Sequence, residues 1–168
     1  RLEQKGFLAS NGFPVPSFVT MTATDQLAAT VRQVGYPAFC KTATAGYDGK
    51  GQWRIGQESD VQEVERALLE SVRPGMRWIV ESLVPFEREL SILVARGSDG
   101  QSCTYPLAEN EHEEGILRTT MVPALASPIV AERAAALARQ VVDRLEGVGV
   151  FCLELFQLSS GELLINEI

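Results

Sequence analysis

The chain has 168 residues, of which 15 are basic, 22 are acidic and 45% are hydrophobic, and its formal net charge is -7. This length is sufficient for one domain or for two small lobes that share a cleft. The negative charge disfavours non-specific binding to nucleic acid, which requires clustered Lys and Arg side chains. The sequence contains neither an apolar run long enough to span a membrane nor a signal-peptide pattern. We therefore expect a cytoplasmic protein with no nucleic-acid partner and no membrane partner.

The three cysteines, Cys40, Cys103 and Cys152, are widely spaced and fall in or beside strand-like segments. This spacing favours buried, reduced thiols over disulfides or a metal cluster. The chain begins at Arg1 without a methionine and stops at Ile168 inside a predicted strand. We therefore expect it to be an excerpt of a longer protein that lacks its N-terminal and C-terminal parts.

Hydrophobic spacing, capping residues and turn residues predict helices and strands in an α+β order. The predicted helices cover residues 2–10, 24–34, 59–73 and 128–145. The predicted strands cover residues 17–20, 38–42, 51–55, 77–84, 87–97, 102–106, 148–158 and 162–168. Asp99-Gly100 and Ser160-Gly161 predict two-residue hairpin turns. The acidic stretch 108–121 predicts an irregular loop at a cleft.

The longest predicted helix has an apolar stripe that we expect to face the core. Its expected inward residues are Ile129, Ala136, Leu137, Val141, Val142 and Leu145.

A lysine stands at the end of the strand at 38–42, directly before a glycine-rich loop. Lys41 is followed by the run Gly46-Tyr-Asp-Gly-Lys-Gly-Gln52. Backbone N–H groups exposed by glycine can approach anionic oxygens closely, and lysines add positive charge. The pattern is therefore consistent with phosphate binding. It equally fits a glycine-rich hairpin with solvated lysines, and it matches neither a Walker loop nor a dinucleotide fingerprint.

The last predicted hairpin places two carboxylates opposite each other. If Ser160-Gly161 is a two-residue turn, Ser159 pairs with Glu162, and Glu154 pairs with Glu167 on one face of the sheet. Two directly opposed carboxylates repel. A bridging divalent cation would turn this repulsion into attraction, and ligands that are all oxygen suit Mg²⁺.

Two other interpretations of this pair stay open. The strand ends could reach solvent, in which case both carboxylates are simply hydrated. A paired acid and base of the glycosidase kind is also possible, but it would leave the lysine and glycine loop without a role.

Several motifs spread over the whole chain resemble those of a known family. They are Lys41 with the loop at 46–52, Glu81-Ser-Leu-Val84, Pro85-Phe-Glu-Arg-Glu-Leu-Ser91, Tyr105-Pro-Leu, Asn110 to Arg118, and Asn166-Glu167 with Glu154. Together they are similar to the ATP-grasp superfamily and, within it, to the family of N5-carboxyaminoimidazole ribonucleotide synthetases. The resemblance implies an ATP-grasp fold in which two α+β lobes with antiparallel sheets enclose the nucleotide.

The resemblance also implies how the chain is divided. Residues 1–84 would form a small lobe, with the lid at 43–51 and an adjoining N-terminal helix. Residues 85–168 would form a larger lobe that carries the metal carboxylates.

The implied nucleotide contacts come from several segments. Lys41 would hold phosphate oxygens, and the lid residues Gly46, Tyr47, Asp48, Gly49, Lys50, Gly51 and Gln52 would close over the triphosphate. The adenine edge would be read by Glu81, Ser82, Leu83 and Val84. Glu89 would bind the ribose hydroxyls, because a carboxylate suits a diol.

The remaining implied contacts concern both ends of the chain. Arg1 and His112 match positions associated with the nucleotide, although His112 could also be an ordinary loop histidine. Glu154 and Glu167 would bind Mg²⁺. Asn166 should face away from them by strand alternation, unless the strand bulges there.

The implied reaction is the ATP-dependent carboxylation of 5-aminoimidazole ribonucleotide with bicarbonate in de novo purine biosynthesis. It would pass through carboxyphosphate. Tyr47, Asp48 and Lys50 would be the catalytic residues, although Tyr47 could equally be a packing residue. The full-length enzyme is expected to be a homodimer, and the isolated fragment is expected to be inactive.

Two alternatives to this function stay open. The chain could belong to another ATP-grasp carboxylate-amine ligase or carboxylase. It could also be a nucleotide-binding fragment without turnover of its own.

Overall fold

The computed structural model describes residues 1–43, 51–113 and 115–168. These residues group into two units, each with its own hydrophobic core. The first unit comprises Arg1–Leu2 and Pro16–Val84, and the second comprises Glu3–Val15 and Pro85–Ile168. The segment 3–15 therefore packs with the second unit, whereas the sequence places the N-terminal helix with the first lobe.

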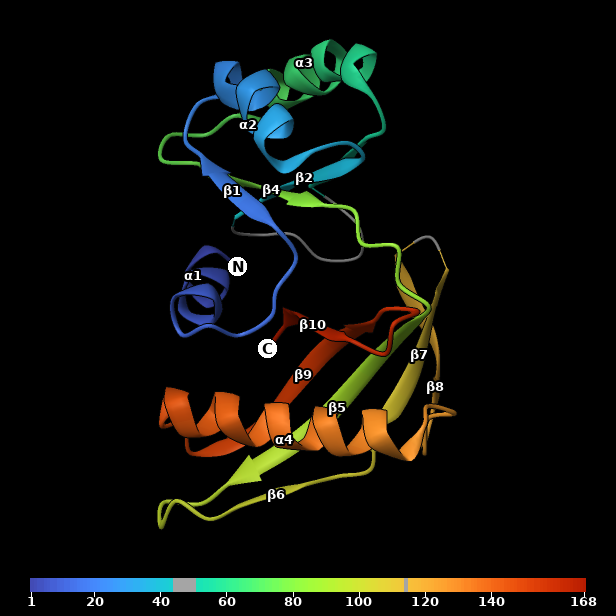
Figure 1. The fold of residues 1–168 in the computed structure, drawn as a ribbon. Coiled ribbons are helices and arrows are strands. Elements are labelled where there is room, and N and C mark those ends of the chain that lie inside the picture. The colour runs from blue at the N-terminus through green and yellow to red at the C-terminus, as the bar shows by residue number, and fades with distance from the viewer. Residues whose placement is uncertain (44–50, 114) are drawn as a thin grey trace. The chain divides into compact units, whose positions relative to one another are not determined.

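The first unit is an antiparallel sheet covered on one face by two helices (Figure 1). Its strands pair in the order β1-β4-β2-β3, and their bounds are Phe18–Met21 for β1, Ala38–Thr42 for β2, Gln52–Ile55 for β3 and Trp78–Ser82 for β4. The covering helices are α2 (Leu27–Val34) and α3 (Val61–Ser71). A short 3-10 turn precedes each helix, η1 (Thr24–Gln26) and η2 (Glu58–Asp60). The face that carries Ala38, Cys40 and Thr42 packs against the helices, so Lys41 lies on the other face.

The turn that leads into α3 is held by Asp60. Its Oδ2 accepts hydrogen bonds from the N–H groups of Gly56, at 2.8 Å, and Gln57, at 3.2 Å. The bond from Gly56 is the main reason why the pKa of Asp60 lies below its ordinary value. Asp60 therefore caps the preceding 3-10 turn, and α3 continues directly from that turn.

The second unit is a larger antiparallel sheet with one long helix across a face (Figure 1). Five strands pair in the order β10-β9-β5-β7-β8, and β6 pairs with β5. Their bounds are Arg88–Arg96 for β5, Ser102–Thr104 for β6, Ala108–Glu113 for β7, Ile116–Met121 for β8, Gly149–Gln157 for β9 and Leu163–Glu167 for β10. The helices are α1 (Leu2–Ser10) and α4 (Pro128–Leu145), and Leu8 of α1 belongs to the same core as α4.

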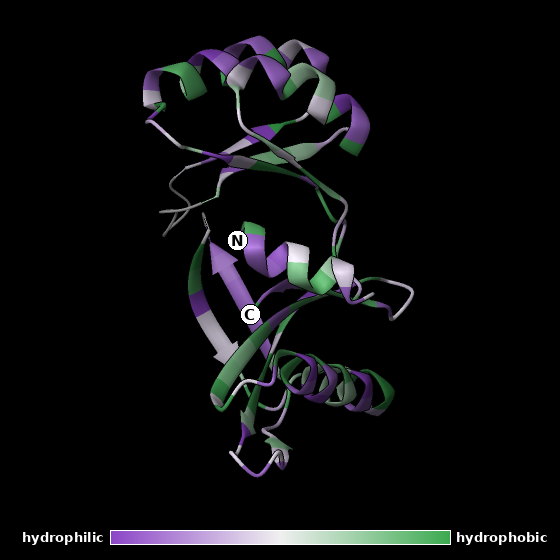
Figure 2. Ribbon diagram, turned by 90° about the vertical axis from the view of Figure 1, so that its left-hand side faces the viewer, coloured by the Kyte–Doolittle hydropathy of each residue, from purple (hydrophilic) through white to green (hydrophobic). Residues whose placement is uncertain are grey.

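Helix α4 has the predicted bounds but buries a different stripe. Ser127 caps its N-terminus, because the Ser127 hydroxyl accepts from the Val130 N–H at 3.4 Å. The buried residues are Val130, Ala134, Ala138, Val141 and Val142. Ile129 is 62% exposed and Leu145 is 40% exposed, so their predicted burial was wrong. The helix is rich in alanine, and hydrophobic and hydrophilic residues alternate along it (Figure 2), so the sequence pattern left the inward face ambiguous.

The stretch 108–121 was wrongly predicted to be an irregular loop. It forms the β7–β8 hairpin, and β7 pairs with β5 through Glu89↔Asn110. Acidic residues are uncommon in strands. Most of those in this stretch are exposed. Backbone pairing with β5 decides the structure here, and sequence propensity does not reveal that pairing.

The turn between β5 and β6 also differs from the prediction. The Gly97 N–H donates to the Gln101 carbonyl at 2.9 Å, so the turn has three residues, Ser98 to Gly100. Gly100 adopts a φ of 83°, which glycine tolerates without strain.

The prediction that the cysteines are buried was right for Cys40 and wrong for the other two. Cys40 is buried, whereas Cys103 and Cys152 are exposed, and all three are free thiols.

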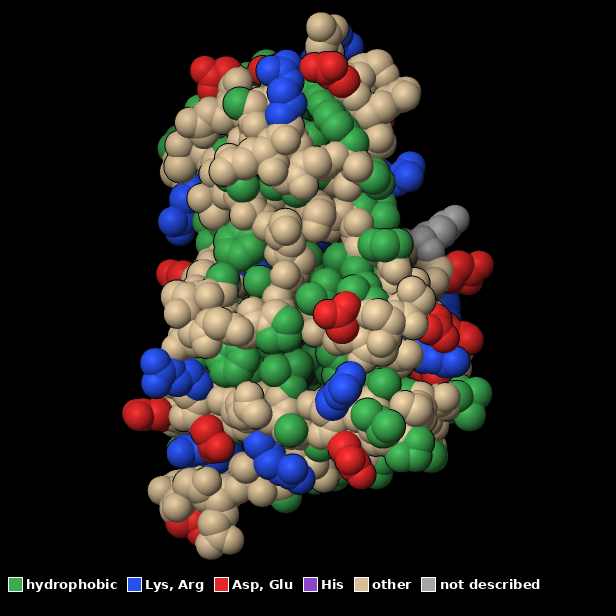
Figure 3. All heavy atoms as spheres, in the orientation of Figure 1, with side chains coloured by type: hydrophobic (Ala, Val, Ile, Leu, Met, Phe, Trp, Pro, Cys, Tyr) green, Lys and Arg blue, Asp and Glu red, His purple; other side chains and the backbone are tan. Residues whose placement is uncertain are grey.

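No helix in the described ranges 1–43, 51–113 and 115–168 is long and apolar enough to cross a membrane. The space-filling view shows hydrophobic, acidic and basic side chains interspersed on one face of the molecule (Figure 3).

Candidate functional site

In the first unit, Lys41 and Glu81 form an ion pair on the sheet face away from α2 and α3. Lys41 Nζ lies 2.7 Å from Glu81 Oε2, and the two side chains are only 17% and 6% exposed. The strands pair Lys41 with Ile79, so Glu81 is its diagonal neighbour on the same face. The structure thus brings together a predicted phosphate ligand and a predicted adenine ligand.

Part of the predicted loop lies outside the described residues. This holds for Gly46, Tyr47, Asp48, Gly49 and Lys50. The loop ends at Gly51, whose carbonyl accepts from the Thr42 N–H at 2.9 Å. Gln52, the last residue of the motif, pairs with Lys41 across β2 and β3.

Gly51 is in a conformation and an environment that suit only glycine. Its φ is 73°, and a Cβ built there would lie 2.8 Å from the Thr42 hydroxyl oxygen. Thr42 Oγ1 is buried without a hydrogen-bond partner in the described part of the chain.

The other predicted nucleotide ligands of the first unit lie in or beside these strands. Arg1 Nη1 donates to the Thr42 carbonyl at 3.4 Å, close to the end of β2. The Leu83 N–H donates to the Pro37 carbonyl at 2.9 Å, so this predicted adenine donor is engaged by the protein itself. Ser82 N–H likewise donates to the Ser17 carbonyl, and Val84 is half-buried.

In the second unit, Glu154 and Glu167 are cross-strand partners, as predicted, but the hairpin that brings them together has another register. The turn has three residues, Ser159 to Gly161, because the Leu158 N–H donates to the Glu162 carbonyl. This shift pairs Ile165 with Leu155. A bulge at Asn166 then inserts one residue and restores the pairing of Glu167 with Glu154.

The three-residue turn puts Asn166 beside Glu154, and the bulge lets Glu167 share that face. Asn166 Nδ2 donates to Glu154 Oε2 at 3.4 Å. Partial burial and then the neighbouring Glu167 charge raise the pKa of Glu154 above its ordinary value. The local environment therefore disfavours the charged form of Glu154, and a cation would reverse that preference.

Glu89 and His112 also form a pair in the second unit. His112 Nδ1 lies 2.6 Å from Glu89 Oε2, and the two side chains are 30% and 23% exposed. Both line a hollow of about 600 Å³ between β5 and β7. The hairpin that sequence reasoning missed is therefore what places His112 against Glu89.

An aromatic stack on the same sheet face was missed by sequence reasoning. The rings of Phe86 and Phe156 are parallel within 5°, with centroids 4.7 Å apart. Phe156 pairs with Glu89 across β5 and β9 and lies two residues after Glu154. Alternation from Glu154 along the strand is the signal that could have placed Phe156 beside the carboxylates.

The donor set around the bulge fits a hard divalent cation. Two carboxylates and an amide oxygen can be offered by Glu154, Glu167 and Asn166, and Mg²⁺ prefers oxygen ligands while keeping several waters. Within the described residues, no three His, Cys, Asp or Glu side chains gather at one point. Three protein oxygens would leave the remaining positions of an octahedral Mg²⁺ shell to water.

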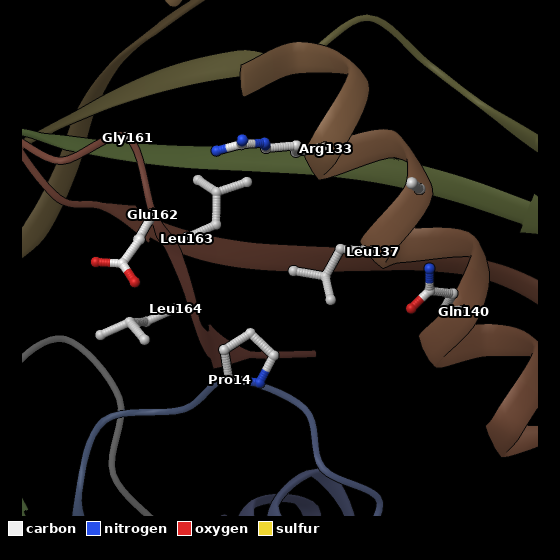
Figure 4. A pocket seen from close by; sticks show the side chains of 9 residues that line it. Pro14, Arg133, Leu137, Gln140, Gly161, Glu162, Leu163 and Leu164 are labelled. Atoms are coloured by element: carbon white, nitrogen blue, oxygen red, sulfur yellow. The ribbon is translucent and has the colours of Figure 1, made fainter. Parts of the chain in front are cut away.

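A separate apolar groove of about 440 Å³ lies between α4 and β10. Figure 4 shows that it is formed by Leu137 of α4, Leu163 and Leu164 of β10, and Pro14, with Arg133 above. Within the part of the chain that the structure describes, no predicted nucleotide or metal ligand lines this groove.

The fold of these two units is that of an ATP-grasp domain. The model of the ATP-grasp domain matches residues 6–168, so the chain belongs to the ATP-grasp family.

The relatives described next have more specific names than the ATP-grasp family. The N5-carboxyaminoimidazole ribonucleotide synthase of Vibrio vulnificus (strain CMCP6) is 37% identical over 170 residues, which cover 100% of this chain and 44% of that protein. A crystal structure of the ADP complex of an N5-carboxyaminoimidazole ribonucleotide synthetase superposes with a TM-score of 0.88 at 36% identity, over 97% of this chain and 42% of the other.

A second similar structure contains two ligands. It is the Aspergillus clavatus N5-carboxyaminoimidazole synthase in complex with ADP and 5-aminoimidazole ribonucleotide, with a TM-score of 0.85 at 27% identity. The similarity covers 99% of this chain and 42% of that one. The chain thus spans less than half the length of the relatives that it resembles.

Proposed function

We propose that this chain is the ATP-binding part of an enzyme that carboxylates 5-aminoimidazole ribonucleotide with bicarbonate at the expense of ATP. The observation that carries the proposal is the similarity, over nearly the whole chain, to proteins named for the product of that reaction. The chemistry of the site residues is consistent with it in both units.

The first unit would supply groups for the phosphates and the adenine. Lys41 lies at a strand end and pairs with Glu81. A phosphate oxygen can compete for the Lys41 ammonium, and Glu81 would then accept a hydrogen bond from the adenine amino group. Gly51 and Gln52 follow the residues that would close over the triphosphate.

The second unit would supply groups for the ribose and the metal. Glu89 presents a carboxylate that can accept from a diol, and His112 orients it. The Phe86 and Phe156 stack would add an apolar platform beside Glu89. Replacing Phe156 with alanine should then weaken ATP binding without changing the affinity for Mg²⁺ alone.

Glu154, Glu167 and Asn166 would hold Mg²⁺. When bound, the ion would neutralise the negative charge that develops on the transferred phosphoryl group. Glu154 and Glu167 would fix its position, and Asn166 would orient Glu154 through their hydrogen bond.

The proposed reaction has two steps. A bicarbonate oxygen attacks the terminal phosphorus of ATP, which gives carboxyphosphate and releases ADP. The exocyclic amine of 5-aminoimidazole ribonucleotide then attacks the carboxyl carbon, and phosphate leaves. Tyr47, Asp48 and Lys50 are proposed to act on these substrates, and closure of their loop would exclude water from the labile intermediate.

The test is ADP release by the complete protein. ADP formation should be stimulated when 5-aminoimidazole ribonucleotide and bicarbonate are supplied together, and carboxylated product should accumulate in equal amount. Stimulation by a different carboxylate or amine acceptor would instead indicate another ATP-grasp ligase. Nucleotide binding with no stimulated turnover would indicate a binding module.

Two further properties belong to the same proposal. We expect the complete enzyme to be a homodimer, which light scattering would test. We expect it to act in the cytoplasm, where its substrates are made.

A further inference from the structure

The strand that carries Asn166 and Glu167 is held along its outer edge by the N-terminal segment of the chain. β10 is an edge strand, since among the described strands it pairs with β9 alone. On its other side, the Ile165 N–H donates to the Pro14 carbonyl at 2.8 Å, and Gln4 Nε2 donates to the Ile168 carbonyl at 2.7 Å. These two contacts flank the bulge at Asn166.

Lys5 makes a third contact at the same place. Its Nζ donates to the Ile165 carbonyl at 3.5 Å, on the residue directly before the bulge. Lys5 is only 2% exposed. Lysine is almost never buried to this degree unless its ammonium is paired, because removing the charge from water is costly. Because burying the Lys5 ammonium is costly, its presence here indicates a role that a hydrophobic residue could not fill.

The geometry at the bulge indicates what that role is. In a regular strand with the observed turn, Asn166 alone would pair with Glu154, and Glu167 would point to the opposite face. The bulge brings both residues to Glu154, but bulges disrupt the ladder locally and leave a residue unpaired. The backbone there therefore needs support from outside the sheet.

We propose that Lys5 is a positioning residue: through the Ile165 carbonyl it fixes the bulge that presents Asn166 and Glu167 beside Glu154. The inference rests on the proposed function, because it assigns Lys5 to the same Mg²⁺ and nucleotide site. Lys5 itself contacts neither ligand in this proposal. It acts through the backbone of β10.

The first experiment measures the bulge without any ligand. In the complete protein, Lys5→Met keeps the buried methylene chain and removes the ammonium. Amide hydrogen exchange should become about tenfold faster at Ile165 to Glu167, while Leu90 in the neighbouring β5 changes little. A general loss of stability would accelerate both regions, so β5 serves as the internal reference.

The second experiment measures the metal dependence of nucleotide binding. Titration with Mg²⁺ at a fixed concentration of an ATP analogue should require about tenfold more Mg²⁺ for Lys5→Met than for the wild type, in line with other residues that support a metal site. Binding of the analogue at saturating Mg²⁺ should be nearly unchanged. A residue that merely stabilised the fold would not shift the Mg²⁺ dependence alone.

Ser10→Ala is the matched control. Ser10 lies on the same helix, is exposed, and bonds only within α1 through the Phe7 carbonyl. It should change neither the exchange at the bulge nor the Mg²⁺ dependence.

The outcomes separate this inference from the proposed function. Unchanged exchange at Ile165 to Glu167 in Lys5→Met overturns the positioning role. Faster exchange with an unchanged Mg²⁺ dependence overturns it as well. If the wild-type protein fails to bind nucleotide with Mg²⁺ at all, the proposed function fails first, and the role of Lys5 in that site fails with it.

Discussion

Glu154 and Glu167 face each other across β9 and β10 because the strand gains one residue at Asn166. The three-residue turn shifts the whole hairpin by one position, and the bulge compensates for this shift just before Glu167. Two opposed carboxylates and an amide consequently share one face of the sheet.

Glu154→Gln and Glu167→Gln should each weaken Mg²⁺-dependent nucleotide binding by about two orders of magnitude, the upper end of the effects seen for residues that support a metal. The apo fold should keep its stability, because each change removes one of two opposed charges. Calorimetric titration with Mg²⁺ and an ATP analogue checks this. Glu132→Gln, an exposed change on α4, is the control, and equal Mg²⁺ dependence in all variants would contradict the metal site.

The stability of the apo protein should depend on pH through Glu154. Its pKa is raised in the folded state, chiefly by partial burial and then by Glu167. The folded state therefore binds the proton more tightly than the unfolded state, and this contribution is complete at low pH and is lost as pH rises through the raised pKa. Urea unfolding across a pH series should show the wild type losing stability relative to Glu154→Gln with increasing pH. Parallel pH curves would rule out a perturbed Glu154.

Gly51→Ala should destabilise the first unit by about 1–3 kcal/mol, the range for a strained backbone position. The substitution combines a positive φ of 73° with a Cβ only 2.8 Å from Thr42 Oγ1. Gly12→Ala is the control, since Gly12 has a similar φ of 76° with nothing within 4 Å. Chemical unfolding of both variants separates the steric contact from the backbone strain, and equal effects would exclude the contact.

The Lys41 and Glu81 ion pair should be energetically coupled. Because both side chains are mostly buried, Lys41→Met alone should cost about 3 kcal/mol by leaving Glu81 without this cation. Adding Glu81→Gln should recover part of that loss, with a coupling of about 1–3 kcal/mol. A double-mutant cycle by urea unfolding measures the coupling. Additive effects of the two changes would mean that the pair contributes nothing.

The three thiols should differ sharply in reactivity. Burial raises the pKa of Cys40 to about 12, so this thiol stays protonated and shielded in the folded state. Cys103 and Cys152 are exposed. Iodoacetamide should modify these two in the native protein, with Cys152 slower because partial burial and then Glu154 raise its pKa. Mass spectrometry after native labelling gives the order, and early modification of Cys40 would refute it.

Local patterns in the sequence were sufficient for most elements. Capping residues and glycine stops located α1 and α4 to the residue and α2 within three residues, because these signals depend on neighbouring residues only. The pairing of Glu154 with Glu167 also came from the sequence, although the turn that was used to derive it has a different length. The motifs spread over the chain, from Lys41 to Asn166-Glu167, together identified the ATP-grasp family, which the match over residues 6–168 confirms.

Other features depended on contacts between distant segments. The acidic stretch at 108–121 has poor strand propensity, and it forms a hairpin because β5 offers it an edge. The inward face of α4 was decided by the sheet beneath it, since alanines made several faces nearly equivalent.

The sequence by itself determined the family, the helices and the chemical identity of the site residues, because these follow from residue types and short-range spacing. Only the tertiary structure decided how the site is built. It placed His112 against Glu89, paired Lys41 with Glu81, and put Asn166 next to Glu154. Each of these contacts joins strands that are far apart in the chain or depends on a one-residue bulge. Backbone pairing fixes these contacts, together with the support that Lys5 gives to the outer edge of β10. Neither can be predicted from the local sequence.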